Sequence, residues 1–397
     1  MAKIAFEDLS FEDKESMIKV NFLRIFYFHL PKNDLKKIGD FALEHKAITF
    51  RNIPQEKAER KFYLLLEKGF KSLRNSLNNK KTVYVHKNSA VPLIGNVSFG
   101  LIDRGTNVIE VKPVTGCNLR CIYCSVDEDR RDMDFVVEKD YLVDEFKKLV
   151  RFKGVDSIEA HIASQGEPLL YSPLPSLGRD LSRIREVKTI SVDTNGTLLT
   201  KSRVDELVDA GLTRFNLSIN ALHEKLAEKI SGTRYNIRRI KDICGHIIKK
   251  KAGLIITPVL LPTVNVDELP KIIGFAKEIG ADIGIQNFLD YKLGRNPVKQ
   301  VSFDEFYKRL KGWELKYRVK LIKSEGDFGI IKTRQLPKPF KKGDVIEAEI
   351  VCPGRLKNEK IAVAKERTIS IPNCHKDKGR IRLRITRSKH NIFIGAL

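Results

Sequence analysis

From Val108 onward the chain alternates between two hydrophobic patterns. Short runs rich in Val, Ile and Leu predict buried strands, and the longer stretches between them place apolar residues three and four positions apart, which predicts helices. Strands and helices that alternate in this way are typical of parallel βα units. Six strands are predicted, at Val108–Val114, Ser157–Ile162, Thr189–Val192, Arg214–Ile219, Leu254–Leu260 and Asp282–Phe288. The helices predicted between them include Tyr141–Arg151, Lys201–Ala210, Tyr235–Lys251 and Val266–Ile279.

Six such units predict an α/β fold whose core, residues 106–325, is a partial (β/α)6 TIM-like barrel. A further helix is predicted at Phe303–Tyr317. In barrels of this type the chemistry lies on the loops that follow the carboxyl ends of the strands. We therefore expect the functional residues on those loops.

The first 105 residues are interpreted as a mostly helical N-terminal cap. Apolar residues at helical spacing predict helices within Phe6–Arg24 and Gln55–Asn75, and two short runs, Thr82–Val85 and Val97–Leu101, predict strands. No catalytic motif is visible in this part of the chain. We expect it to cover the open side of the core or to contact the substrate.

The chain changes character over residues 326–397. Five short β runs broken by Gly and Asn predict a small, OB-like β-barrel. They are Val345–Val351, Ile361–Ala364, Thr368–Ile371, Arg380–Ile385 and Asn391–Gly395. Arg380, Arg382 and Arg384 alternate along one predicted strand and Arg387 follows, so one face of that strand is expected to be cationic. Such a face suits RNA, although basic residues also protect exposed edge strands from aggregation.

Composition narrows the class of protein. The 397 residues carry 73 Lys and Arg against 50 Asp and Glu, a net charge of +23, which favours a polyanionic partner such as nucleic acid. The alternative is a thermophile-like composition, with abundant Lys, Arg and Glu and little Met, but that pattern adds charges of both signs. The N-terminus lacks the apolar segment of a signal peptide, and no apolar run is long enough to span a bilayer, so we expect a cytoplasmic protein.

Three of the six cysteines stand close together, as Cys117-Asn-Leu-Arg-Cys121-Ile-Tyr-Cys124. Soft thiolate ligands select iron–sulfur clusters, zinc or copper(I). A structural zinc site needs four ligands, usually as two close pairs, and no second pair follows here. The spacing therefore favours a [4Fe–4S] cluster held at three irons, with the fourth iron open to a small molecule.

This stretch resembles the CxxxCxxC signature of the radical S-adenosylmethionine (SAM) superfamily, including the aromatic Tyr123. The resemblance extends along the chain, because Ser164-Gln-Gly-Glu-Pro168 is similar to the family's GGEP motif and Thr194-Asn195-Gly196-Thr197 is similar to its TNG turn. In the first of these, Gln165 replaces the first glycine. An ordinary Asn-Gly turn is the alternative for the second.

The resemblance implies the cofactors and the residues that hold them. Cys117, Cys121 and Cys124 would bind a [4Fe–4S] cluster, and its fourth iron would bind SAM. One electron would then cleave SAM to methionine and a 5′-deoxyadenosyl radical, with a ferredoxin or flavodoxin as the electron donor. The SAM-contacting residues implied in this way are Tyr123, Gly166, Glu167, Thr194, Asn195, Ser218, Asn220 and Val259.

Substrate contacts are harder to assign. Tyr291, Lys292 and Arg295 follow the sixth strand and are candidates for contact with RNA, as are the four arginines of the C-terminal segment. His161 is interpreted as a core histidine rather than a catalyst. Cys352 and Cys374 are interpreted as packed thiols, the alternative being that one of them carries a methyl group or donates hydrogen.

The C-terminal segment resembles a TRAM domain, an OB-like RNA-binding module of RNA-modifying enzymes. The leading hypothesis is therefore a radical SAM enzyme that methylates or otherwise functionalises a base of tRNA or rRNA. Methylthiotransferases also join a radical core to such a module, but they need three further N-terminal cysteines, and this chain has none before Cys117. The alternatives are modification of a protein, peptide or small metabolite, and a non-catalytic iron–sulfur protein that binds RNA.

Overall fold

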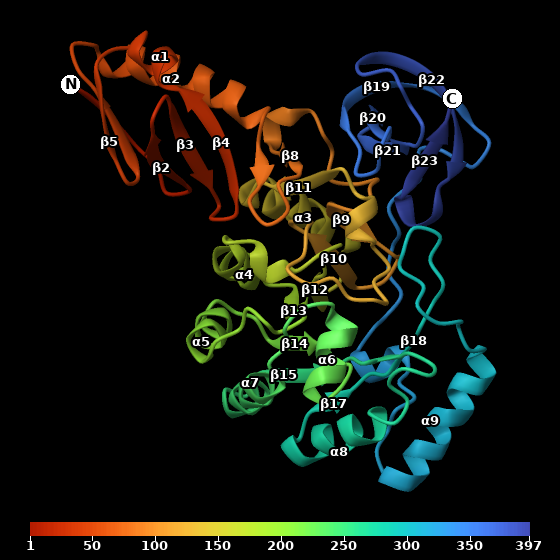
Figure 1. The fold of residues 1–397 in the computed structure, drawn as a ribbon. Coiled ribbons are helices and arrows are strands. Elements are labelled where there is room, and N and C mark those ends of the chain that lie inside the picture. The colour runs from red at the N-terminus through yellow and green to blue at the C-terminus, as the bar shows by residue number, and fades with distance from the viewer.

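The computed structural model describes all residues from Met1 to Leu397, and a seven-stranded sheet forms its centre (Figure 1). The strand order is β17-β15-β14-β13-β12-β10-β9, in which β9 alone is antiparallel to its neighbour. The strands are β9 (Gly100–Asp103), β10 (Val108–Lys112), β12 (Ile158–Ile162), β13 (Val187–Thr194), β14 (Arg214–Leu217), β15 (Gly253–Ile256) and β17 (Asp282–Ile283). Two short strands, β16 (Val259–Leu260) and β18 (Gln286–Asn287), pair beyond β15 and β17. All six predicted strands of the core are present, the last two each divided in two.

Helices cover one face of this sheet. They are α3 (Lys139–Lys153), α4 (Leu174–Ser182), α5 (Lys201–Asp209), α6 (Glu224–Ser231), α7 (Ile237–Lys249) and α8 (Leu269–Ile279), and α9 (Phe303–Tyr317) follows the last strand. The four helices predicted between the strands are confirmed, as is α9. The sequence analysis did not predict the short helices α4 and α6, of 9 and 8 residues.

The two faces of the sheet differ in polarity. Along β14, Phe215 and Leu217 lie in the main apolar core, whereas Asn216 and the following Ser218 point to the other face. That inner face is polar on the neighbouring strands as well, with Glu110, Lys112, Glu159, His161, Ser191, Asp193 and Arg214. The apolar core therefore lies between sheet and helices, and the inner face is left for polar ligands.

The N-terminal region is mostly β-structure, so the predicted helical cap is wrong. Phe6–Arg24 forms a hairpin of β2 (Leu9–Lys14) and β3 (Met17–Phe22), in which buried and exposed residues alternate with the period of a strand. The other elements here are β1 (Ala2–Ala5), β4 (Phe26–Pro31), α1 (Lys32–Lys36), β5 (Phe41–Glu44), β6 (Ala47–Phe50), α2 (Gln55–Phe70), β7 (Arg74–Asn75) and β8 (Lys81–Val85). Of the predicted elements, the helix at α2 and the strand at β8 are confirmed.

Strands cross the predicted boundary at residue 105. β9 completes the core sheet, whereas β11 (Met133–Val137), which follows the cysteine motif, joins the N-terminal sheet in the order β11-β8-β7-β4-β3-β2. The segment at Ile331–Lys332 also pairs with Thr106 and Asn107. The N-terminal lobe is therefore built into the core on both sides of the cysteine motif.

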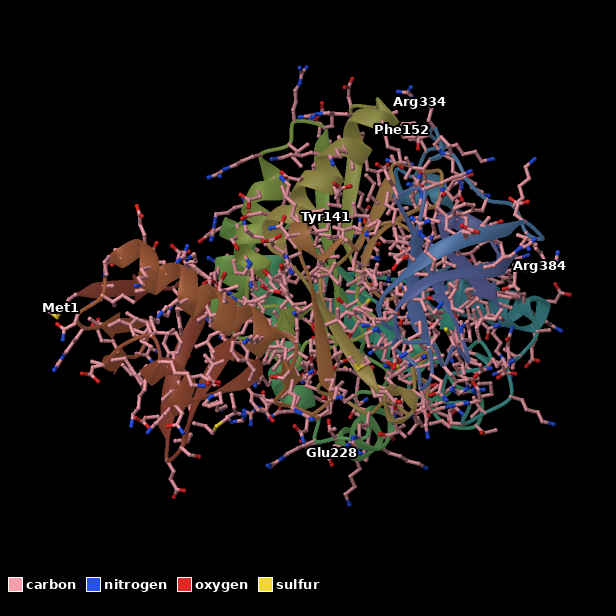
Figure 2. The ribbon with its side chains drawn as sticks, turned by 90° about the horizontal axis from the view of Figure 1, so that it is seen from above. Met1, Tyr141, Phe152, Glu228, Arg334 and Arg384 are labelled. Atoms are coloured by element: carbon pink, nitrogen blue, oxygen red, sulfur yellow. The ribbon has the colours of Figure 1, made fainter.

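The C-terminal residues form the predicted small barrel, closed in the order β19-β20-β21-β23-β22. Its strands are β19 (Val345–Pro353), β20 (Lys360–Ala364), β21 (Arg367–Ile371), β22 (Gly379–Arg387) and β23 (Phe393–Ala396). Cys374 lies in the apolar interior of this barrel, and Cys352 packs against the main core. In Figure 2, Met1 and Arg384 mark opposite sides of the molecule, with the core between them. No helix in the structure is both long and apolar enough to cross a membrane.

Gly95 fixes the contact between the barrel and the chain that leads into β9. Its carbonyl accepts a hydrogen bond from the Phe393 N–H (3.0 Å), and the Ile94 carbonyl accepts one from the Thr368 N–H (2.9 Å). Gly95 has φ +126°, and a Cβ there would lie 2.2 Å from the Thr368 carbonyl oxygen. Only glycine fits this close approach of two backbones.

We expect Gly95→Ala to destabilise the protein by roughly 2–4 kcal/mol, because backbone strain adds to a steric overlap that only movement of the barrel can relieve. Thermal unfolding of the purified protein measures the loss. Gly274→Ala is the matched control, since nothing lies within 4 Å of its Cβ inside α8, and it should be neutral or stabilising. Equal unfolding midpoints for the two variants would contradict this interpretation.

Candidate radical site

The three cysteines of the motif lie on the loop that follows β10. All three are free thiols and half-buried. The Leu119 N–H donates to Cys117 Sγ and the Val126 N–H donates to Cys124 Sγ, both at 3.4 Å. Burial raises the pKa of all three thiols, that of Cys121 to about 12, and the Cys117 pKa is raised further by the Glu167 charge and by the other two thiols. Thiols this close to one another need a metal centre to become thiolates together.

The donor set fits an iron–sulfur cluster. The structure contains no group of three Cys, His, Asp or Glu side chains that converges on one metal ion. A [4Fe–4S] cube makes a different demand, since it takes one thiolate at each of several irons, and peptide N–H groups donate to the sulfurs. Cys117, Cys121 and Cys124 provide the three thiolates, and the sulfurs of Cys117 and Cys124 already accept peptide N–H groups.

Two glycines allow close contact between the cysteine loop and the loop after β12. Gly116 and Gly166 form a parallel backbone bridge, and the Glu167 N–H donates to the Gly116 carbonyl (2.9 Å). A Cβ on Gly166 would lie only 2.0 Å from that carbonyl oxygen. The residue before Cys117 and the residue before Glu167 are therefore in direct contact.

Glu167 joins the ends of β12 and β13. Its carboxylate is buried and accepts hydrogen bonds from the Leu169 N–H (3.0 Å), the Thr194 hydroxyl (2.7 Å) and the Asn195 N–H (2.9 Å). Burial raises the pKa of Glu167 to about 7, against the lowering effect of these donors. A cationic ligand beside this carboxylate would favour its ionised form.

A chain of amides ties the TNG turn to the cysteine loop. The Asn195 amide donates to Asn118 Oδ1 (3.0 Å), and the Asn118 amide donates to the Thr197 hydroxyl (2.8 Å). Asn118 lies inside the cysteine motif. The loops after β10, β12 and β13 are therefore one hydrogen-bonded unit.

A small cavity beside Cys121 gathers four of the predicted SAM residues, namely Tyr123, Asn195, Ser218 and Asn220. The Asn220 amide donates to the Tyr123 hydroxyl (2.7 Å), and the Val259 N–H donates to Asn220 Oδ1 (2.8 Å). The structure therefore brings Val259 next to this group. Together with Gly166, Glu167 and Thr194, all eight residues predicted to contact SAM lie around the cysteine loop.

Comparison with known proteins agrees with this geometry. Residues 111–276 match the model of the radical SAM superfamily. The chain is 42% identical to an uncharacterized protein of Methanocaldococcus jannaschii over 360 residues, which are 82% of this chain and 83% of that protein. The chain belongs to the radical SAM superfamily. Its cofactors are accordingly a [4Fe–4S] cluster and SAM.

More distant matches are less similar to this chain or cover less of it. The chain is 32% identical to the GTP 3′,8-cyclase of Listeria monocytogenes serotype 4b, over 46% of this chain and 53% of the cyclase. The chain thus spans about half the length of that relative. The structure of SuiB from Streptococcus suis with bound S-adenosylmethionine aligns with 80% of this chain and 71% of the SuiB chain. The sequence identity is 14% and the TM-score is 0.43. A likeness at that level does not bear on function.

Further residues, which the sequence analysis did not name, support the radical SAM site. The Tyr235 hydroxyl donates to the Asn195 carbonyl (2.8 Å), and burial raises its pKa strongly. The end of α6 holds the cysteine loop, because the Ser231 and Ile230 carbonyls accept from the N–H groups of Arg120 and Ile122 (both 2.9 Å). Asn118 stands within the motif and could have been noticed there. Nothing in the local sequence of Tyr235 indicates its role.

Arg295 has a different role from the predicted one. It was a candidate for RNA contact, but its guanidinium donates to Asp127 (3.0 Å), Asp129 (2.8 Å) and the Arg120 carbonyl (2.8 Å), and its N–H donates to the Cys124 carbonyl. These acceptors all lie on the segment that carries the cysteines. Arg295 therefore fastens the loop after β18 to the cysteine loop and has little capacity left for a phosphate.

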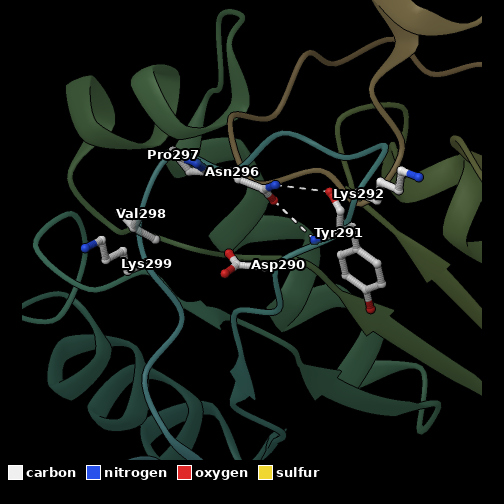
Figure 3. A pocket seen from close by; sticks show the side chains of 7 residues that line it. All are labelled: Asp290, Tyr291, Lys292, Asn296, Pro297, Val298 and Lys299. Carbon is white, nitrogen blue, oxygen red and sulfur yellow. Dashed lines mark hydrogen bonds between the residues drawn. The ribbon is translucent and has the colours of Figure 1, made fainter.

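The other two candidates on this loop are exposed. Tyr291 and Lys292 line an open pocket with Asp290, Asn296, Pro297, Val298 and Lys299 (Figure 3). Asn296 bonds the backbone of Tyr291 at both its N–H (3.3 Å) and its carbonyl (3.1 Å), which shapes the loop. The pocket adjoins the radical site, because Gly294 packs against the Cys124 carbonyl.

His161 lies on the polar inner face with partners on both ring nitrogens. Nδ1 is 2.8 Å from the Ser191 hydroxyl and Nε2 is 3.2 Å from Asp193. Burial lowers the pKa of His161, but the Asp193 and Glu159 charges outweigh it and the net shift is upward. The ring is thus fully hydrogen-bonded, as expected for a structural histidine.

We expect Gly166→Ala to lose the cluster while the rest of the fold survives, because the new methyl group can be placed only if the Gly116 backbone moves and carries Cys117 with it. Iron and sulfide content and the visible absorbance after anaerobic reconstitution measure this. Gly312→Ala in α9, where nothing lies within 4 Å, should retain a full cluster. A G166A protein with normal iron content would contradict the assignment of this contact.

The raised pKa of Glu167 predicts that the stability of the cofactor-free protein depends on pH. Its pKa is about 7 when folded and 4.5 as an ordinary glutamate, so the folded state keeps a proton that the unfolded state loses between these values. The free energy of unfolding should therefore fall as pH rises from 4.5 to 7, by on the order of 3 kcal/mol. Denaturant titrations measure it. Glu167→Gln should remove this dependence, and Glu278→Gln at an exposed position should leave it intact.

Proposed function

We propose that this radical SAM enzyme modifies a base of tRNA or rRNA in the cytoplasm, by methylation or another carbon-centred change. The observation that carries the proposal is a closed five-stranded barrel with a row of outward-facing arginines on β22, attached to the radical core. Its closed five-stranded form agrees with the resemblance to a TRAM module. The net charge of +23 points the same way.

The arginines of β22 are not equivalent. Arg380 and Arg382 stand opposite Glu349 and Glu347 of β19, which neutralise part of the predicted cationic face. Arg384 stands opposite Val345, and Arg387 follows at the end of the strand. Figure 2 shows Arg384 on the outer side of the barrel, away from the core. Arg384 and Arg387 are therefore the better candidates for phosphate contact.

The inner face of the sheet has room for a base. A cavity between β14, β15, β17 and α9 is lined by Arg214, Asn216, Phe306 and Tyr307, among others. Arg214 Nε and Asn216 Oδ1 are buried and have no hydrogen-bond partner, so a donor and an acceptor are both available. A planar heterocycle with complementary edges and aromatic contacts fits such a cavity. Because Ser218 follows Asn216 on the same strand face, a base held here would lie next to the SAM residues.

The mechanism assigns roles to residues of this chain. Cys117, Cys121 and Cys124 would hold the cluster, and the cluster together with SAM would supply a radical able to abstract hydrogen from the substrate. Glu167 would orient the amino group of SAM, while Asn220 and Val259 would hold its nucleoside end. Tyr235 and the end of α6 hold the cysteine loop in place and shield it from water.

A reduced ferredoxin or flavodoxin is the proposed electron donor. Lys292 and Lys299 surround the open pocket that adjoins the Cys124 loop, so an acidic protein could approach the cluster from this side. Basic charge in this region therefore does not by itself argue for RNA. The barrel arginines lie elsewhere and provide the separate argument.

A small nucleotide is the second candidate substrate. Its support is the sequence identity to GTP 3′,8-cyclases, whose name gives a nucleoside triphosphate as substrate, and the same unpaired groups of the inner face would serve such a ligand. A peptide substrate has less support. Of the three cysteines beyond the motif, Cys244 and Cys374 are buried in apolar cores, which leaves little for auxiliary clusters.

The double variant Arg384→Gln/Arg387→Gln should bind tRNA more weakly, because two phosphate contacts are lost. The slope of log affinity against log salt should become shallower by about 1.4–1.8, the value for two released counterions. Filter binding or fluorescence anisotropy at several salt concentrations measures it. Arg380→Gln/Arg382→Gln removes the same charge where glutamates already neutralise it and should have a smaller effect. Equal effects of the two pairs would contradict the assignment.

Nucleoside mass spectrometry tests the function itself. A strain without this gene should lack one modified nucleoside in its tRNA or rRNA, and its mass should identify the added group. Restoring the gene should return the nucleoside, whereas a Cys121→Ala copy should not, because that protein cannot hold the cluster. Unchanged nucleosides in both RNA pools would exclude RNA as the substrate and favour the small nucleotide.

A further inference from the structure

One arginine of the C-terminal barrel is buried in the radical core. Arg355 lies on the loop between β19 and β20, and its side chain is only 3% exposed. Its guanidinium donates to Glu128 (2.7 Å) and to the Gln165 side-chain oxygen (3.1 Å) and lies 3.7 Å from Asp134. Its carbonyl accepts from the Asp132 N–H (2.9 Å). This loop is therefore tied to the core through both side chain and backbone.

Both hydrogen-bond partners of Arg355 stand beside the cofactor site. Gln165 directly precedes Gly166 and Glu167, at the position where this chain departs from the GGEP motif. Its oxygen also accepts from the Ser98 hydroxyl (3.1 Å). Glu128 follows Cys124 by four residues and also faces Lys80 of the N-terminal lobe (3.5 Å). Residues from all three parts of the chain thus meet next to the third cysteine.

Several charged side chains meet at this junction. Arg131 is buried close by, and its pKa is lowered by burial and then by the charge of Arg355. Arg355 and Arg131 both have a buried Nε without a hydrogen-bond partner. Arg355 pairs with Glu128 and Asp134, and removing either side of such a contact would leave a buried charge uncompensated. Because Glu128 follows Cys124 by four residues, the Arg355 guanidinium lies beside the segment that carries the cysteines.

We propose that Arg355 is a positioning residue of the radical site, supplied by the C-terminal barrel. It holds Gln165 against the loop that carries Glu167, and it places a positive charge beside the cysteine loop, where reduction of a cluster adds negative charge. The barrel is then a necessary part of the radical machinery as well as a module for binding substrate. This inference holds whatever the substrate is, so it can fail independently of the proposed role in RNA modification.

Two substitutions separate position from charge. Arg355→Met keeps most of the side-chain volume and removes both the charge and the hydrogen bonds, whereas Arg355→Lys keeps the charge and loses the two-armed contact. Lys357→Met, at an exposed position on the same loop, is the matched control. Each full-length protein is reconstituted anaerobically with iron and sulfide. The midpoint potential of the cluster, SAM affinity and the rate of 5′-deoxyadenosine formation without substrate are measured.

We expect R355M to shift the midpoint potential to more negative values and to slow SAM cleavage about 10-fold or more, as the loss of a charged hydrogen bond implies. R355K should restore the potential, and its SAM affinity should remain weaker than that of the unchanged protein. K357M should match the unchanged protein in all three measurements. A folded R355M with unchanged potential, SAM affinity and cleavage rate would overturn the proposal.

A second variant tests the proposal even if R355M does not fold. Gln165→Ala removes one contact of Arg355 and keeps its pair with Glu128, so the buried charge stays compensated. Hydrogen exchange of the cofactor-free protein should show faster exchange at the backbone of residues 165–169 than in the unchanged protein, and SAM affinity should fall. Unchanged exchange and affinity in Q165A would show that Arg355 only fastens the barrel, and would reject the positioning role.

Discussion

The contact between Gly116 and Gly166 is the constraint on which the radical site depends. It brings the loops after β10 and β12 so close that a Cβ on Gly166 would lie 2.0 Å from the Gly116 carbonyl oxygen, and one backbone hydrogen bond joins them. Glu167 follows at once and collects the donors at the end of β13. Cluster ligands and SAM ligands are therefore not separate groups of residues. A shift in either loop moves both.

Two carboxylates, Asp134 (buried) and Glu128 (partly buried), extend this unit to the flanking parts of the chain. Asp134 accepts from the Thr115 hydroxyl (2.9 Å) within the core and from the Asn75 amide (2.9 Å) of the N-terminal lobe. Glu128 receives Lys80 from that lobe and Arg355 from the barrel. A buried carboxylate without its partners is costly, so these contacts favour the docked arrangement of lobe, core and barrel. Asp134 holds Thr115, which lies just before the cysteine motif, and Glu128 follows the motif, so the cysteine loop is held at both ends.

Sequence patterns predicted the parts whose signal is local. Strands such as β12 and β13 are short apolar runs, and the cysteines and Glu167 stand in motifs, so the core and its cofactor residues could be found. In the N-terminal lobe, the apolar residues around β2 and β3 imitate helical spacing, because Phe6 and Leu9 are three positions apart and Ile18 and Phe22 are four apart. Arg355 and Gln165 are 190 residues apart and no pattern connects them. Arg295 looked free because its partners, Asp127 and Asp129, lie on a different loop.

The arrangement of apolar surface explains how one domain can be both stable and open to ligands. Phe215 and Leu217 of β14 face the helices, and the alternating residues Asn216 and Ser218 face inward. Burial against the helices supplies the favourable free energy, since it scales with the apolar area removed from water. The inner face is then free to carry unpaired polar groups such as Asn216 Oδ1, whose cost falls when a ligand supplies the missing hydrogen bond. A substrate that forms these missing hydrogen bonds gains affinity, whereas the same unpaired groups in an apolar core would only reduce stability.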